Sequence, residues 1–79
     1  MRTYELVMIF RPEMAETEVR SEVSQVEKAL VERGAEIKHL NEGYYAVVSF
    51  QGPVAAVDDL DRALALSDNV LRHKFIRPE

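Results

Sequence analysis

Basic side chains gather near the C-terminal end of the sequence, where they could neutralise the phosphates of a nucleic acid. Arg72, His73, Lys74 and Arg77 lie close together there. The net charge of −4 opposes general binding to polyanions, because that affinity comes from lysine and arginine. A local basic patch nevertheless keeps its own positive potential when the total charge is negative. We therefore expect phosphate contacts, if any, to be local.

The other polar residues form no pattern that indicates catalysis or metal binding. The sequence has no cysteine, which excludes disulfides and thiolate metal sites and fits a reducing compartment. His39 and His73 lack a metal-site spacing to a carboxylate, and no Ser/His/Asp or Cys/His set is visible. Residues 11–14 lack the glycine that an acylphosphatase-like phosphate loop needs. We expect no enzyme activity, no cofactor and no metal.

Alternation of side chains predicts that residues 3–10 form a strand, because strand side chains point to opposite faces in turn. The more apolar face, expected in the core, carries Tyr4, Leu6, Met8 and Phe10. Val7 and Ile9 keep the other face partly apolar. Pro12 then ends the strand.

Two segments have the spacing of amphipathic helices. Residues 16–33 form the first helix, with a weak N-cap at Ala15 and a C-terminal stop at Gly34. A second helix begins near Pro53. The apolar stripes that should face the core consist of Val19, Val23, Val26 and Leu30 in the first helix and Val57, Leu60 and Leu64 in the second.

Three more strands are predicted over residues 35–40, 44–50 and 70–77. The residues 41–43 between the first two end in glycine, which suits a tight antiparallel hairpin with a type I turn and a bulge. In the last strand, Leu71, His73 and Phe75 are expected on the core face. Arg72, Lys74 and Ile76 are expected on the opposite face.

The order βαββαβ predicts one α+β domain over residues 1–79, with the ferredoxin-like fold. Right-handed crossovers place both helices on one face of a four-stranded antiparallel sheet and leave the other face open. The residues expected on that open face are Glu5, Val7, Ile9, Tyr45, Val47, Arg72, Lys74 and Ile76. Basic residues interleaved with apolar and aromatic ones suit RNA or a partner protein.

Four short strings, taken in order along the chain, resemble the bacterial small-subunit ribosomal protein six family. They are MRTYE at residues 1–5, GAEI at 34–37, EGYY at 42–45 and LALSDNVLRH at 64–73. The last string is the most specific. The resemblance spans nearly the whole chain and implies the βαββαβ fold, contact with ribosomal RNA of the small subunit, pairing with small-subunit ribosomal protein eighteen, and no catalysis.

The resemblance also locates candidate binding residues. Phosphate contacts are expected at the ends of the first and last strands, from Arg2, Arg72, Lys74 and Arg77. The partner-binding candidates are Val7, Ile9, Tyr45 and Val47. The simpler interpretation of the basic residues is solvated charge, with lysine on an edge strand blocking aggregation.

The chain departs from the family in length. Family members usually carry a basic insert between the second and third strands. The length of the strands and the short hairpin loop between them indicate that roughly fifteen residues of this insert are absent here. The usual C-terminal tail is also missing, since the chain stops at Glu79. The sequence does not separate a natural deletion from a deliberate one.

Other side chains have structural interpretations. His73 is expected to be a hydrogen-bonded histidine at the edge of the core, and His39 to be solvated. Tyr44 and Tyr45 should point to opposite faces, one into the core and the other toward cross-strand packing, a base or a partner.

A second function from a different class competes with the first. The chain could be a truncated or engineered derivative that acts as a protein-interaction or self-assembling scaffold and has lost RNA binding. The second strand is short, so part of the third strand's edge should be unpaired and available to a homo-oligomer. The sequence has no signal peptide and no membrane span, which predicts a soluble, cytoplasmic, ribosome-associated protein with no membrane partner.

Overall fold

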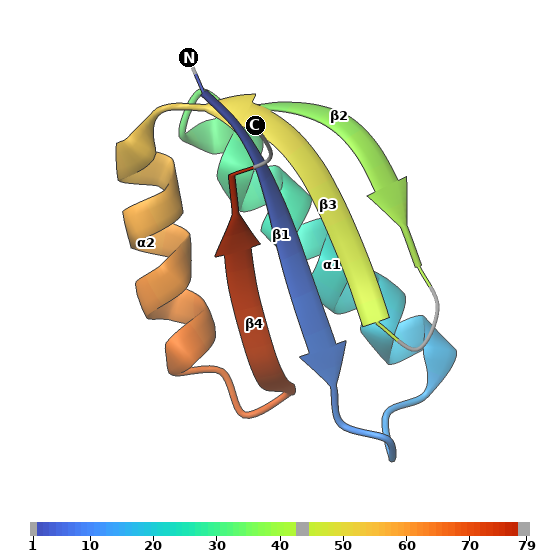
Figure 1. Ribbon diagram of the computed structural model, residues 1–79. Coiled ribbons are helices and arrows are strands. Elements are labelled where there is room, and N and C mark those ends of the chain that lie inside the picture. Colours follow the sequence, from blue (N-terminus) through green and yellow to red (C-terminus); the bar gives the residue numbers. More distant parts are fainter. Residues whose placement is uncertain (1, 43–44, 78–79) are drawn as a thin grey trace.

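Six elements follow one another in the order β-α-β-β-α-β in the computed structural model, which describes residues 2–42 and 45–77 (Figure 1). The strands are β1 (Arg2–Phe10), β2 (Glu36–Asn41), β3 (Tyr45–Gly52) and β4 (Val70–Ile76). The helices are α1 (Glu16–Glu32) and α2 (Val54–Ala65). All six predicted elements are confirmed, with ends that differ by one or two residues.

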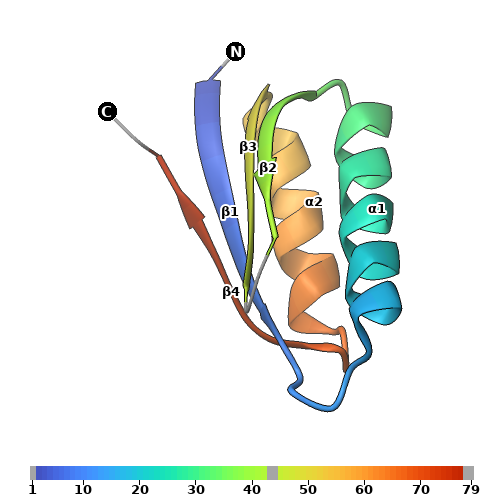
Figure 2. The same ribbon diagram turned by 90° about the vertical axis from the view of Figure 1, so that its right-hand side faces the viewer.

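The four strands form one sheet in the order β2-β3-β1-β4, and every neighbouring pair is antiparallel. Both helices pack against the same face of this sheet, as the edge-on view shows (Figure 2). The ferredoxin-like fold is therefore confirmed. The opposite face carries no element of the described chain.

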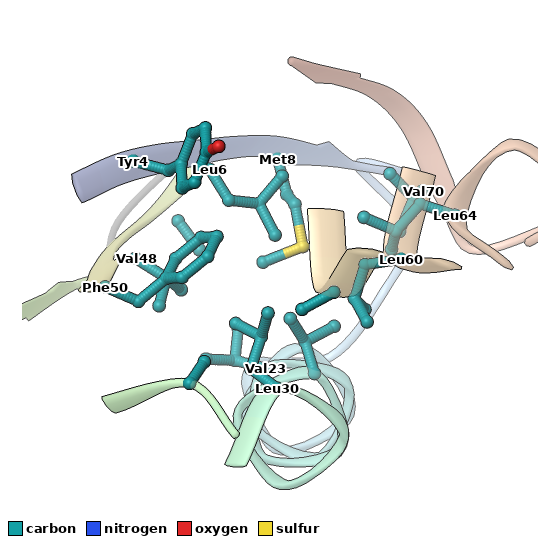
Figure 3. Packing of buried hydrophobic residues seen from close by; sticks show 14 of the residues in the cluster. Tyr4, Leu6, Met8, Val23, Leu30, Val48, Phe50, Leu60, Leu64 and Val70 are labelled. Carbon is teal, nitrogen blue, oxygen red and sulfur yellow. The ribbon is translucent and has the colours of Figure 1, made fainter. Parts of the chain in front are cut away.

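The core lies between the sheet and the helices (Figure 3). The predicted inward face of β1 is buried, and the ring of Tyr4 stacks on Phe50 with 5.6 Å between centroids. The helices bury the expected stripes only in part, because Val19 and Val57 lie at the rim while Ala56 is fully inside. The buried helical residues are Val23, Val26, Leu30, Ala56, Leu60 and Leu64.

Backbone geometry at two places explains how α1 begins and ends. Ala15 is the N-cap and has no side chain that could accept a bond, but its own N–H donates to Oε1 of Glu18 at 2.9 Å. This bond supplies one half of a capping box. Gly34 follows the helix with a φ of +88°, the left-handed conformation that glycine adopts at least cost.

The start of β4 differs from the predicted alternation. Phe10 pairs with Val70 and Ile9 with Arg72, so Leu71 is an extra residue, a β-bulge. Val70 is buried, whereas Leu71 is 56 % exposed. The prediction that Leu71 faces the core is therefore wrong, and the rest of the strand has the expected faces because the bulge resets the alternation.

β2 covers most, but not all, of the edge of β3. β2 pairs with β3 from Glu36 opposite Gln51 to Asn41 opposite Val47, so β3 lies inside the sheet. The described pairing does not reach Tyr45 and Ala46, in agreement with the expectation that part of this edge is unpaired. The outer strands of the described sheet are β2 and β4. The β2–β3 hairpin is confirmed, whereas the predicted turn at Gly43 and the side chain of Tyr44 lie outside the described residues.

Candidate functional site

The face of the sheet opposite the helices, here called the open face, collects the side chains predicted for it. Residues paired across antiparallel strands point to the same side of a sheet. Since Tyr4, Leu6, Met8 and Phe10 are buried under the helices, the alternate residues of β1 and their partners lie on the other side. The pairing places there Glu5, Val7, Ile9, Tyr45, Val47, Arg72, Lys74 and Ile76.

The strand register arranges six of these residues in two parallel rows across β3, β1 and β4. In the first row, Ile9 lies directly between Tyr45 and Arg72. In the second row, Val7 lies between Val47 and Lys74. Directly opposed side chains in a sheet lie about 5 Å apart at Cβ, so each row is a continuous surface that runs from an apolar end to a cation.

The rows are open to solvent and slightly hollowed. Tyr45 is 54 % exposed and Ile9 is 41 % exposed, although both are large apolar side chains. A shallow groove of about 380 Å³ runs along β1 and β4, lined by Val7, Ile9, Arg72, His73, Lys74 and Ile76. An exposed apolar floor beside two cations is the composition of an interaction surface.

The two cations of the rows are not neutralised by the chain itself. Among residues 2–42 and 45–77, neither Arg72 nor Lys74 has an ion-pair or hydrogen-bond partner. The helical side of the molecule has the opposite character, because its exposed residues include Glu16, Glu18 and Asp58. The charge of the chain is therefore divided between its two faces, and the open face is the one suited to anions.

The remaining predicted RNA residues lie elsewhere. Arg2 pairs with Gly52 at the end of β1 remote from the first row, and on the same side of the strand as Tyr4. Arg77 follows the last residue of β4. Because β1 begins and β4 ends at the same end of the sheet (Figure 1), these two arginines lie at that end, away from the first row.

The structure agrees with the predicted open face and adds its arrangement. Arg72 and Lys74 were assigned to RNA, and Val7, Ile9, Tyr45 and Val47 to a partner protein, and the register joins both sets in the same two rows. The alternation of the three strands predicted the shared face. The rows depend on which strands become neighbours, and local alternation does not contain that.

His73 belongs to the core side of β4 and not to the open face. Its Nε2 lies 2.7 Å from Oδ1 of Asp61 on α2, and its ring meets the edge of Phe75 at 6.3 Å between centroids. The hydrogen-bonded histidine expected from the sequence is confirmed, with a structural role between α2 and β4. His39 is exposed on β2, opposite Ser49.

A second hollow, of about 520 Å³, lies where β1 leads into α1. No pattern in the sequence predicted this hollow. At the rim of this hollow, Arg20 forms ion pairs with Glu16 at 2.9 Å and with Glu42 at 3.8 Å. The charge of Arg20 is therefore paired within the chain. The hollow is lined by Phe10, Arg11, Pro12, Met14, Glu16, Val19, Arg20 and Glu42.

Two classes of site receive no support within the described ranges. No group of three histidine, aspartate or glutamate side chains there could hold a metal ion. No helix in the described part of the chain is long and apolar enough to cross a membrane. The open face is therefore the principal candidate for function.

Comparison with known proteins identifies the family. The sequence model described as Ribosomal protein S6 matches residues 35–77, which is more than half of the chain. The chain belongs to the ribosomal protein S6 family. This family consists of ribosomal proteins and not of enzymes, and the predicted resemblance is confirmed.

Curated S6 relatives extend the match to the full chain. The small ribosomal subunit protein bS6 of Paenarthrobacter aurescens is 35 % identical over 100 % of this chain and 93 % of its own length. The bS6 protein of Symbiobacterium thermophilum is 30 % identical over 99 % of this chain and 98 % of its own. Among solved structures, 30S ribosomal protein S6 from Thermotoga maritima shares the fold, with a TM-score of 0.87 and 24 % identity over 98 % of this chain and 87 % of that one.

The S6 relatives are longer than this chain. The alignment with the Paenarthrobacter aurescens protein covers 94 positions and includes all 79 residues, so 15 positions of the relative have no counterpart here. This number agrees with the predicted shortening. Only three residues separate β2 from β3, which is where the sequence places the missing insert.

Proposed function

We propose that this chain is a structural protein of the small ribosomal subunit that binds ribosomal RNA together with small-subunit ribosomal protein eighteen, and that it acts in the cytoplasm on the ribosome. The names of the S6 relatives support the ribosomal role. The observation that carries the binding role is the open face, where unpaired cations adjoin exposed apolar side chains.

The apolar ends of the two rows are the part suited to a partner protein. Tyr45, Ile9, Val47 and Val7 lie side by side on β3 and β1. Covering apolar surface stabilises a complex by about 25 cal/mol for each Å² removed from water. The helices cannot supply this cover, because they occupy the other face of the sheet (Figure 2).

The cationic residues are the part suited to RNA. Arg72 and Lys74 lie at the β4 end of the rows, and Arg2 and Arg77 lie at the end of the sheet where β1 begins. Each lysine or arginine that neutralises a phosphate releases counterions and makes the affinity depend on salt. The acidic helices repel RNA, so they orient the open face toward it.

Binding to a fragment of small-subunit ribosomal RNA, measured over a salt series with and without protein eighteen, tests this proposal. We expect tight binding that weakens steeply with salt when protein eighteen is present. Arg72→Gln and Lys74→Gln should each lower the slope of log affinity against log salt by about 1. Arg62→Gln, on the exposed side of α2, is the matched control and should leave the slope unchanged.

Two results would contradict the proposal. Absence of binding at low salt with protein eighteen present would mean that the chain keeps the fold of the family without its activity. A slope that falls as much for Arg62→Gln as for Lys74→Gln would mean that the open face has no special role.

A further inference from the structure

Tyr45 presents an aromatic ring that the described chain leaves without an aromatic partner. The described ring contacts join Tyr4, Phe50, Phe75 and His73, and none of them includes Tyr45. The side chain is 54 % exposed at the end of the first row. An exposed ring on a sheet face is a surface on which a nucleobase can stack.

Arg72 and Lys74 lie at a distance from the Tyr45 ring that one nucleotide can span. Neighbouring strands are about 4.8 Å apart, so Arg72, two strands away across Ile9, lies roughly 10 Å from Tyr45 at the backbone. Lys74 follows Arg72 on the same side of β4, roughly 7 Å further along the strand. A base on Tyr45 would therefore place its sugar near Ile9 and its phosphates near the two cations.

From this arrangement we infer that the open face binds unpaired nucleotides of an RNA single strand. One base stacks on Tyr45, and Arg72 and Lys74 hold the adjacent phosphates. The inference rests on the proposed function and adds which form of RNA this surface takes. It concerns the rows alone and not the arginines at the other end of the sheet. Of the apolar side chains suited to a partner protein, it assigns Tyr45 and Ile9 to RNA and leaves Val47 and Val7 to protein eighteen.

The shape of the surface favours a single strand over a duplex. The major groove of A-form RNA is deep and narrow, and a sheet face cannot enter it. Unpaired bases can turn outward and lie flat on a sheet, where every base offers a face for stacking. The open face offers such a surface, since both rows run across three paired strands.

The same surface is less suited to an acidic peptide. An extended peptide gains affinity by adding its backbone to a sheet edge, where N–H and C=O groups are unpaired. In the rows, the backbones of β1 and of β3 at Val47 are already paired on both sides, and only Tyr45 lies beyond the described β2–β3 pairing. A peptide on this face would find the two cations but no backbone partners, whereas a nucleotide uses the ring and the cations together.

Fluorescence anisotropy of a labelled short oligouridylate, titrated with the full chain over a salt series, tests the inference. We expect the oligouridylate to bind more tightly than an RNA duplex of equal length. Tyr45→Ala should weaken binding about tenfold, the equivalent of about 1.4 kcal/mol, and Tyr45→Phe should retain it. Arg72→Gln and Lys74→Gln should each lower the salt slope by about 0.7, and Arg62→Gln should leave it unchanged.

Two results would overturn the inference. They are equal or tighter binding of the duplex, and unchanged affinity in Tyr45→Ala. If polyglutamate also displaces oligouridylate in the second case, the surface recognises negative charge alone.

The two proposals fail separately. If the ribosomal RNA fragment binds with protein eighteen while Tyr45→Ala leaves oligouridylate binding unchanged, the proposed function stands and the inference is wrong. If oligouridylate binds as expected while the ribosomal fragment does not, the inference stands and the proposed function is wrong.

Discussion

Gly52, the last residue of β3, lies so close to Ala35 that a Cβ atom at position 52 would stand 2.9 Å from the Cβ of Ala35. Such a separation is shorter than a van der Waals contact, and Ala35 is itself buried in the core. The start of β2 is thereby fixed against the end of β3. Glycine is needed here for space and not for a special backbone angle, since its φ is not positive.

Gly52→Ala should therefore lower the free energy of unfolding by about 1–3 kcal/mol, the usual cost of overpacking. Urea denaturation followed by circular dichroism measures the change. Ala35→Gly removes the conflicting methyl group, so the double variant should lose less stability than the sum of the two single variants. Strict additivity would show that the two positions do not compete for the same space.

Tyr4 buries a hydroxyl group without a hydrogen-bond partner among the described residues, and its side chain is only 3 % exposed. Tyr4→Phe removes this group and keeps the ring that stacks on Phe50. We expect the free energy of unfolding to rise by about 1 kcal/mol, because an unsatisfied buried group carries its desolvation cost. Thermal denaturation of the two proteins measures this change in the free energy of unfolding.

Tyr45→Phe is the matched control for that experiment, because the hydroxyl of Tyr45 is on an exposed side chain. Its effect should stay within about 0.5 kcal/mol. A loss of stability in Tyr4→Phe would mean that the hydroxyl has a partner, such as a buried water molecule.

His73 and Asp61 connect β4 to α2 through one hydrogen bond of 2.7 Å. The Asp61 side chain is 63 % exposed, so water competes for it and the coupling should be small. A double-mutant cycle with His73→Ala and Asp61→Ala should give about 0.5 kcal/mol. Asp58→Ala, at an exposed position of the same helix, combined with His73→Ala should show none. Equal coupling in both cycles would contradict a specific contact.

β4 is an outer strand, and its cations should keep it from pairing with a second copy. In a two-fold antiparallel pairing centred on His73, Arg72 of each copy would face Lys74 of the other, and like charges in that position are destabilising. Lys74→Glu converts both repulsions into attractions. Sedimentation equilibrium at low salt should show a monomer for the unsubstituted chain and self-association for Lys74→Glu. Salt-independent dimers of the unsubstituted chain would contradict this account.

Local patterns were sufficient to predict the elements but not the contacts between them. The alternation of Tyr4, Leu6, Met8 and Phe10 and the spacing of Val23, Val26 and Leu30 encode burial directly, because each side of a strand or helix has one environment. The contact of Gly52 with Ala35 depends on how two strands meet in space, and no local rule contains it.

The candidate site was predictable in its members and not in its arrangement. Alternation along β1 and β4 identified Ile9, Arg72 and Lys74 as outward-facing. Their grouping with Tyr45 into rows follows from the strand order and register, which are set by the whole core. Nothing in the sequence marked the bulge at Leu71, since a leucine suits either face of a strand.

The bulge has a consequence for comparing this chain with other proteins. Val70 and Arg72 are two positions apart, yet they point to opposite sides of the sheet only because Leu71 is inserted between the paired positions. A homologue that lacks a counterpart of Leu71 would keep Val70 inside and Arg72 outside by simple alternation. A homologue that keeps this residue but pairs it regularly, without the bulge, would turn Val70 out to the open face. In this strand, conservation of individual residues is therefore informative only when the placement of a single alignment gap is known.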